Sequence, residues 1–200
     1  SYLDLLKRRH IVGNEELEKL CENIWNNQEY KSALEILYSY KPDRLPLISK
    51  YLQDNIPSYN LTKMDSCSRR FIRFSDSRFE SKSQNEGKGW TKSNKILLYE
   101  FQNSSNGLFL KFIMGPSTNT TFRETVFHSL SKSQFFDPGK TLSAKWNQLW
   151  SSEVIITQEE LSNSSIDEIE NKLKEWMEVF FSQNEGFEKI HSHIYPLIQE

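Results

Sequence analysis

Residues 95–114 read KILLYEFQNSSNGLFLKFIM, two apolar runs separated by a polar connection, and this pattern predicts a β-hairpin. The first run covers 95–102 and the second covers 108–114. The connection between Asn103 and Gly107 holds only small and polar residues, which favour a turn. Gly115 and Pro116 end the second strand. The hairpin therefore predicts an antiparallel sheet in the middle of the chain.

Two further segments are expected to extend this sheet. Residues 70–74 carry Phe71, Ile72 and Phe74 in a short strand pattern, and 154–156 form a candidate edge strand. The polar stretch 81–89 is expected to be a loop, because it has too few apolar residues to bury one face. Residues 135–152 are expected to be irregular or extended, with Trp146 and Trp150 as anchors.

Segments with helical periodicity lie before and after the predicted sheet in the sequence. Apolar residues at helical spacing indicate three short helices within 14–56. Thr121 with Glu124, and Ser165 with Glu168, have the spacing of capping boxes and predict the starts of two later helices. The second of these is the longest, and a last helix begins after Gly186. The expected fold class is therefore α+β: N-terminal helices, an antiparallel sheet of three to five strands, and C-terminal helices packed on it.

The length of 200 residues fits one domain of ordinary size or a small helical segment joined to a second unit. The expected division is a helical lead segment over 1–62 and an α+β domain over 63–200, with one continuous domain as the alternative. Thirteen Phe, eight Tyr and five Trp are enough aromatic residues to close a substantial core.

Cysteine content and hydropathy limit the class of protein. The two cysteines, Cys21 and Cys67, argue against a disulfide scaffold and against a thiolate zinc site, and both are expected to be free. No apolar run approaches the roughly 18 residues of a membrane span, and the first residues resemble neither a signal peptide nor a transit peptide. A cytoplasmic protein without a membrane partner is expected.

Charge is unevenly distributed along the chain. Residues 61–150 hold 14 Lys and Arg against 7 Asp and Glu, whereas 151–200 hold 3 against 11. A basic middle segment favours contact with phosphates, and an acidic end favours water or a basic partner. The simpler alternative is that the two segments attract each other.

The basic segment contains the candidates for nucleic-acid contact. Arginine side chains and aromatic rings together suit phosphate and base contact. The alternative is a half-buried strand with one solvated face, or a surface that docks the acidic helix after Ser165. The candidate nucleic-acid-binding residues are Arg69, Arg70, Arg73, Arg78, Lys82, Lys88 and Trp90.

Two other sites are weaker candidates. The segment from Gly115 to Thr118 lies between a strand and a helix start, where free amides with Arg123 nearby have the chemistry of an anion site. The alternative is that Gly115 and Pro116 only end the strand. His191 and His193 are the only close histidine pair, but residues two apart on a helix point in different directions, so no metal site is expected.

Asp76 and Glu100 are the one pair of carboxylates for which a catalytic role is considered as an alternative. Metal-dependent nucleases of the PD-(D/E)XK kind place an acid on one strand and an acid-x-Lys motif on the next, and the carboxylates hold Mg²⁺. Here Asp76 comes after one predicted strand, and Glu100 lies on the next with Gln102 in the lysine position. Glutamine does not carry the charge of lysine. A divergent nuclease that uses Asp76, Glu100 and Mg²⁺ is therefore the last of three functional hypotheses.

Two stretches resemble one group of bacterial PD-(D/E)XK nuclease-like proteins. Residues 18–25 and 33–43 resemble the helical segment located after the catalytic core in that group. Gly89 and Trp90, the runs 96–101 and 108–116, and Arg123 resemble the region of those proteins immediately C-terminal to the helical segment. In the group, the catalytic acid and the Glu-x-Lys motif precede the helical segment, so no catalytic residue or cofactor is carried over to these positions.

The resemblance implies a non-catalytic C-terminal recognition or regulatory domain of a nuclease-like bacterial protein, with a role in defence against foreign DNA. Its expected partners are an upstream nuclease-like domain or another protein, and DNA. The alternative is a stand-alone protein-interaction domain that does not bind nucleic acid.

Overall fold

The computed structural model describes residues 14–39, 43–87 and 89–199, which belong to two units, Ser1–Asp43 and Arg44–Glu200. In the first, the helical unit, α2 (Asn14–Asn26) and α3 (Gln28–Ser39) form the first two predicted helices. Asn27 joins them, and its side-chain oxygen accepts hydrogen bonds from the backbone N–H groups of Glu29 and Tyr30 at 3.0 and 3.3 Å. This contact caps the start of α3.

The second unit, the sheet unit, begins with the third predicted helix, α4 (Leu45–Asn55), and a 3₁₀ turn, η1 (Ile56–Ser58). The boundary at 43/44 differs from the expected boundary at 62/63. Ile48, Leu52 and Ile56 are completely buried in the core of the sheet unit, so the apolar face of α4 belongs there. Pro46 stands in the first turn of α4, where its missing N–H costs nothing.

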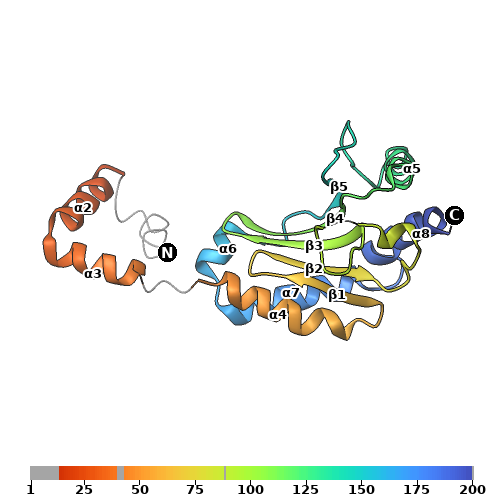
Figure 1. Cartoon of the computed structure of the whole chain (residues 1–200). Coiled ribbons are helices and arrows are strands. Elements are labelled where there is room, and N and C mark those ends of the chain that lie inside the picture. The colour runs from red at the N-terminus through yellow and green to blue at the C-terminus, as the bar shows by residue number, and fades with distance from the viewer. Residues whose placement is uncertain (1–13, 40–42, 88, 200) are drawn as a thin grey trace. The chain divides into compact units, whose positions relative to one another are not determined.

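One antiparallel sheet organises the sheet unit (Figure 1). Its strand order follows the chain from β1 to β5, and the short β6 pairs with the start of β4. The α+β class with an antiparallel sheet is therefore confirmed. The strands are β1 (Thr62–Cys67), β2 (Phe71–Asp76), β3 (Leu97–Ser104), β4 (Gly107–Met114), β5 (Asn147–Ser151) and β6 (Ile156–Thr157).

The predicted hairpin is present, with a tighter turn than expected. Ser104 pairs with Gly107, so only Ser105 and Asn106 remain as the turn. Gly107 has a φ of 130°, and a side chain there would start 2.8 Å from the carbonyl oxygen of Ile156. Glycine is required by both the backbone angle and the close approach of β6.

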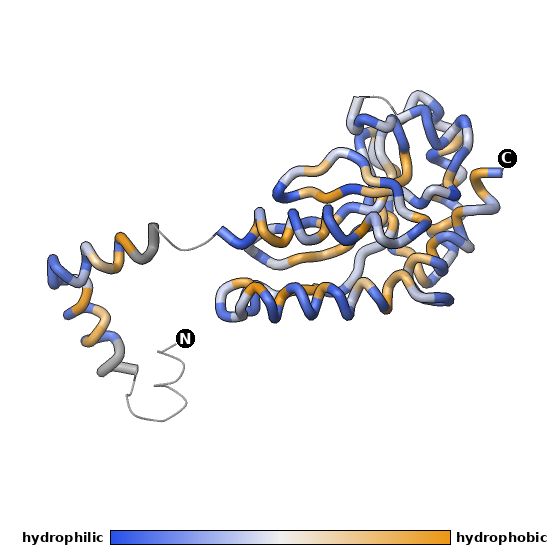
Figure 2. The backbone as a smooth tube through the Cα atoms, turned by 90° about the horizontal axis from the view of Figure 1, so that it is seen from below, coloured by the Kyte–Doolittle hydropathy of each residue, from blue (hydrophilic) through white to orange (hydrophobic). Residues whose placement is uncertain are grey.

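Helices α4, α7 and α8 cover one face of the sheet (Figure 1). Phe101 lies 5.9 Å from Trp176 of α7, and Tyr99 lies 5.2 Å from Phe187 of α8, between ring centres. In Figure 2 the helices alternate between blue and orange along their length, as expected of helices with one buried face. The later helices are α5 (Thr120–Leu130), α6 (Gln158–Asn163), α7 (Ile166–Phe180) and α8 (Gly186–Ile198).

The other face of the sheet is covered at one end by the loop between β2 and β3. This loop contains a 3₁₀ turn, η2 (Ser83–Asn85), and Trp90. The Trp90 ring lies against Gly115, where an added Cβ would stand 2.1 Å from a ring carbon. Its Nε1–H donates to the Lys95 carbonyl at 3.0 Å. We call the uncovered part of this face the open face.

Two capping predictions had different outcomes. Ser165 and Glu168 form the predicted capping box at the start of α7. The box predicted at Thr121 is wrong: the side chain of Asn119 caps α5 by accepting the backbone N–H of Phe122 at 3.0 Å. Asparagine is as good an N-cap as threonine, and its position two residues earlier lengthens the helix.

Candidate functional site

The open face displays a row of three side chains across neighbouring strands. Phe71 of β2 is paired with Gln102 of β3, and Gln102 is paired with Phe109 of β4. Residues paired across an antiparallel sheet point to the same face. The row therefore places an amide between two aromatic rings. Phe71 is 39% exposed, and Phe109 is partly exposed.

A second row, of charged side chains, runs beside the first. Arg73 of β2 is paired with Glu100, and Glu100 is paired with Lys111 of β4. The first row, Phe71, Gln102 and Phe109, is called the aromatic row. Each charged residue lies two positions along its strand from a member of the aromatic row and so points to the same face.

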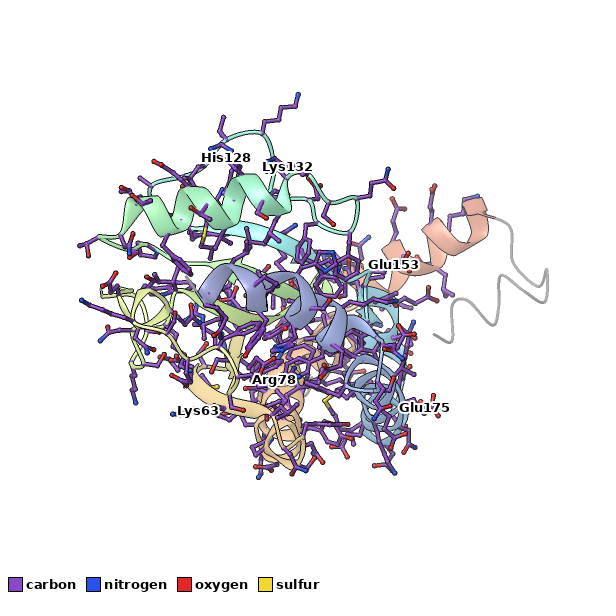
Figure 3. The ribbon with its side chains drawn as sticks, turned by 90° about the vertical axis from the view of Figure 1, so that its right-hand side faces the viewer. Lys63, Arg78, His128, Lys132, Glu153 and Glu175 are labelled. Carbon is purple, nitrogen blue, oxygen red and sulfur yellow. The ribbon has the colours of Figure 1, made fainter. Side chains whose placement is uncertain are left out.

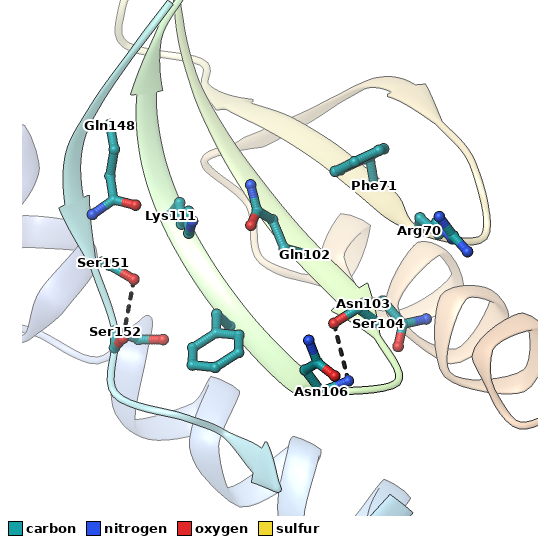
Figure 4. A pocket seen from close by; sticks show the side chains of 11 residues that line it. Arg70, Phe71, Gln102, Asn103, Ser104, Asn106, Lys111, Gln148, Ser151 and Ser152 are labelled. Carbon is teal, nitrogen blue, oxygen red and sulfur yellow. Dashed lines mark hydrogen bonds between the residues drawn. The ribbon is translucent and has the colours of Figure 1, made fainter. Parts of the chain in front are cut away.

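A groove of about 570 Å³ opens over Phe71, Gln102 and Phe109 and over Lys111 of the second row (Figure 4). In the figure, Phe71, Gln102, Lys111 and Gln148 come from four neighbouring strands. The lining contains two cations, two aromatic rings, amides and hydroxyl groups. Its main members are Arg70, Phe71, Gln102, Phe109, Lys111 and Gln148, and Asn103, Ser104, Asn106, Ser151 and Ser152 complete it.

The charge of Arg73 is neutralised within the sheet. Its Nε donates to Glu100 Oε2 at 2.6 Å, and the Glu100 side chain is only 5% exposed. The second oxygen of Glu100 accepts the Gln102 amide at 2.9 Å. The Arg73 guanidinium also lies 5.4 Å from the Phe71 ring centre and 5.5 Å from the Trp90 ring centre. Arg73 therefore holds the wall of the groove in place.

Arg70 and Lys111 are the two cations in the lining of the groove. Within 43–87 and 89–199, no carboxylate lies within 4 Å of either side chain. None of the residues that line the groove is an Asp or Glu. The groove therefore carries two cations without a carboxylate within 4 Å, beside partly exposed rings.

Arg78, a sequence candidate for nucleic-acid contact, lies on the helix-covered face and is inaccessible from the groove. It contacts both carboxylate oxygens of Asp76 and donates to Glu188 of α8 at 2.9 Å. Figure 3 labels Arg78 near the ribbon of α8. Burial lowers the pKa of Arg78, but the hydrogen bonds and charges of Asp76 and Glu188 outweigh it and raise the pKa above its usual value. This contact agrees with the alternative in which part of the basic segment docks the acidic end.

Asp76 and Glu100 are not brought together. Asp76 is completely buried and lies 3.2 Å from His191 Nδ1, on the side of α8. Glu100 points to the open face with Arg73. Among the residues that the structure describes, no group of three or more His, Cys, Asp or Glu is placed to hold a metal ion. The geometry gives the divergent nuclease hypothesis no shared metal site.

The other sequence candidates have separate positions. Arg69 is exposed, and its carbonyl accepts the Asn103 amide at 2.8 Å. Lys82 is exposed beside η2, and Trp90 packs against Gly115. Lys88 lies outside the described residues. Of the members of the predicted set that the structure describes, only Arg70 lines the groove, and Arg73 contacts the Phe71 ring in its wall.

Arg123, the anion-site candidate, is 4% exposed and is held by neutral groups. It donates to the Ser143 carbonyl at 2.7 Å and to Asn147 at 3.4 Å. Burial lowers the pKa of Arg123. Asn119 already occupies an amide at the start of α5. The structure therefore gives Arg123 a role in fixing the segment before β5.

His191 and His193 have different partners. His191 meets Asp76, whereas His193 Nδ1 lies 2.8 Å from the Lys189 carbonyl. Cys21 and Cys67 are both free, as expected.

Among the main members of the groove, sequence reasoning missed Gln102 as a site residue, Phe109, Lys111 and Gln148. The signal for three of them was the hairpin itself. Once the turn is placed at Ser105 and Asn106, alternation puts Gln102, Phe109 and Lys111 on one face. Gln148 had no such signal, because β5 was not predicted as a strand.

Comparisons with protein-family models, with curated proteins and with solved structures find no match to this chain. Among the described helices, none is long and apolar enough to cross a membrane.

Proposed function

We propose that this chain is a non-catalytic recognition domain of a nuclease-like protein and that it binds nucleic acid in the groove on the open face of the sheet. The proposal is carried by one observation: the groove has two cations without carboxylate partners, Arg70 and Lys111, and no acidic residue in its lining. Phosphate groups are the natural partners of such cations.

The chemistry of the other lining residues supports the same proposal. Gln102, Gln148 and Asn106 offer amide donors and acceptors, which hydrogen-bond sugars and base edges. Because Arg73 is neutralised by Glu100, the proposed attraction depends on fewer charges than the basic segment contains.

The test is a titration of fluorescently labelled oligonucleotides, single-stranded and duplex, at low salt, monitored by anisotropy. The double variant Arg70→Gln/Lys111→Gln is expected to raise Kd about tenfold or more, because two charge-assisted contacts are lost. The matched control is Lys132→Gln/Lys174→Gln, which removes the same charge from exposed positions outside the groove lining and keeps the wild-type Kd.

Two results contradict the proposal. One is no binding of any oligonucleotide by the wild-type chain at low salt, where electrostatic attraction is least screened. The other is an equal loss of affinity in both double variants. Cleavage of plasmid DNA with Mg²⁺ that disappears in Glu100→Ala would restore the catalytic hypothesis.

A second candidate function, a protein-interaction domain without nucleic-acid binding, is favoured by the helical unit. Trp25 of α2 is 62% exposed and Tyr30 of α3 is 56% exposed in the structure. Large exposed aromatic residues are enriched at protein interfaces. This candidate predicts no anisotropy change with any oligonucleotide, so the same titration separates the two functions.

A further inference from the structure

The aromatic row on the open face holds its two rings on strands that are not direct neighbours. Phe71 and Phe109 stand on the outer two of three neighbouring strands, in register with Gln102 between them. Two strand spacings separate them by roughly 10 Å. Each ring therefore has room for its own base, and neither ring fills the space of the other.

Each ring has a cation beside it. Arg70 directly precedes Phe71, and Lys111 comes two residues after Phe109, on the same face of β4. A ring with a neighbouring cation matches a nucleotide, which joins a flat base to a phosphate. The groove contains such a pair twice: Arg70 and Phe71 at the start of β2, and Phe109 and Lys111 on β4.

The first ring is preorganised. The Arg73 guanidinium lies 5.4 Å from the Phe71 ring centre, and Arg73 is itself fixed by Glu100 at 2.6 Å and by Trp90. A ring held by its neighbours loses little conformational entropy when a ligand stacks on it.

The side-chain amide of Gln102, between the two rings, has a hydrogen-bond acceptor that no described residue uses. Gln102 Nε2 donates to Glu100, whereas no described residue donates to Gln102 Oε1. A free acceptor between two stacking positions suits an amino group on a base edge. That edge is accessible when the base is unpaired.

From these contacts we infer that the groove binds single-stranded nucleic acid, with bases stacked on Phe71 and Phe109 and phosphates at Arg70 and Lys111. The inference rests on the proposed function and narrows its ligand. Bases inside a duplex are stacked on one another, so their faces do not reach rings on a sheet, whereas a single strand presents them.

The experiment compares three ligands of about 12 nucleotides in the anisotropy assay: a single strand, a duplex of the same sequence and an abasic strand. The single strand is expected to bind most tightly. Phe71→Ala and Phe109→Ala are each expected to weaken its binding about 5- to 150-fold, the loss of one stacked base. Phe71→Tyr, which keeps an aromatic face, is expected to retain the wild-type Kd.

Tyr195→Ala is the matched aromatic control, because Tyr195 is exposed on α8, which covers the opposite face. Thermal unfolding of each variant shows whether the fold is retained. If Phe109→Ala is unfolded, Phe109→Leu replaces it, since leucine preserves apolar bulk but offers no ring.

Three outcomes overturn the inference and are distinguishable from failure of the proposed function. Equal affinity for duplex and single strand, equal affinity for the abasic strand, or unchanged affinity in both Phe variants would show that bases do not stack here. If Arg70→Gln/Lys111→Gln still weakens binding, the proposed function stands without the single-strand preference. If no ligand binds the wild-type chain, both proposals fail.

Discussion

The Asp76 side chain is completely buried and contacts two side chains that are cationic or can be protonated, Arg78 and His191. Its carboxylate receives the Arg78 side chain at 2.6 Å and faces His191 at 3.2 Å. The backbone N–H of Arg78 also donates to it at 2.9 Å. Loss of its charge would leave the Arg78 side chain, which is 24% exposed, with Glu188 as its one carboxylate partner among the residues that the structure describes.

Asp76→Asn is therefore expected to lower the free energy of unfolding by about 3 kcal/mol, the usual cost of breaking a buried pair. Glu188→Gln is the control, because its carboxylate is partly exposed and its contribution is expected to stay below about 1 kcal/mol. Urea denaturation measures both. Equal effects of the two substitutions would show that burial of Asp76 does not determine its contribution.

Tyr99 has a completely buried hydroxyl for which the described residues supply no hydrogen-bond partner. Burial, together with the smaller effect of the Asp76 charge, raises its pKa well above the usual value of 10.0. The folded chain therefore keeps this proton when the unfolded chain loses it. The resulting contribution to stability is complete below about pH 10 and is lost as pH rises further.

We expect Tyr99→Phe to leave stability at neutral pH unchanged or to raise it by about 1 kcal/mol, because a buried hydroxyl without a partner is costly. The decline of stability above pH 10 is expected to be shallower than in wild type. It does not vanish, since burial also raises the pKa of Tyr51 and Tyr59. A loss above about 1 kcal/mol at neutral pH would mean that the hydroxyl has a partner.

At the scale of elements, α7 shows how local sequence positions the helix-covered face. The Ser165 side chain accepts the Glu168 N–H at 3.2 Å, and Glu168 accepts the Ser165 N–H at 2.7 Å. Beyond this cap, Ile169, Leu173 and Met177 are buried against the sheet at helical spacing. The capping box and the apolar face of α7 were both predictable from the sequence, because each involves residues close together in the chain.

Ser165→Ala is expected to lower the free energy of unfolding by about 1 kcal/mol through loss of the N-cap. Ser162→Ala is the control: this exposed hydroxyl donates only to the Gln158 carbonyl within α6. Chemical denaturation with an unchanged slope would attribute the difference to stability alone. Equal effects of the two substitutions would argue against a capping role for Ser165.

The elements missed in the sequence are short or lie at edges. β1 is an edge strand without buried residues, so it lacks the alternation that identifies a strand. β5 has five residues and two buried positions, and α6 has six residues and none. The hairpin of β3 and β4 was predictable because its turn fixes the register locally.

The candidate site was only partly predictable for the same reason. Gln102, Phe109 and Lys111 share one hairpin, whereas Phe71 reaches Gln102 across a connection of about twenty residues. Composition indicated a basic segment, but not that Arg73 and Arg78 are paired with carboxylates on opposite faces of the sheet. That distinction depends on how strands distant in the sequence pair with each other.

At the scale of the sheet unit, the uneven charge of the sequence becomes a difference between two faces. The acidic residues of 151–200 are mostly on α6, α7 and α8, and α7 and α8 cover the face opposite the groove. The groove keeps the positive charges of Arg70 and Lys111. A polyanion is expected to meet the open face.

This arrangement predicts a modest salt dependence. Each phosphate neutralised on a single strand contributes a slope of about −0.7 in log K against log salt, so two contacts give about −1.4. Arg70→Gln/Lys111→Gln is expected to flatten the slope towards zero. A wild-type slope near −3, unchanged in this variant, would mean that other cations carry the contact.

Binding of nucleic acid by the open face is tested most sharply by a chemical-shift map of the labelled chain during titration with a single-stranded oligonucleotide. We expect the backbone signals of Phe71, Gln102, Phe109 and Lys111 to shift together with one Kd, while those of α7 do not move. Shifts confined to α7 and α8 or to the helical unit, or no shifts at millimolar oligonucleotide, would contradict binding at this face.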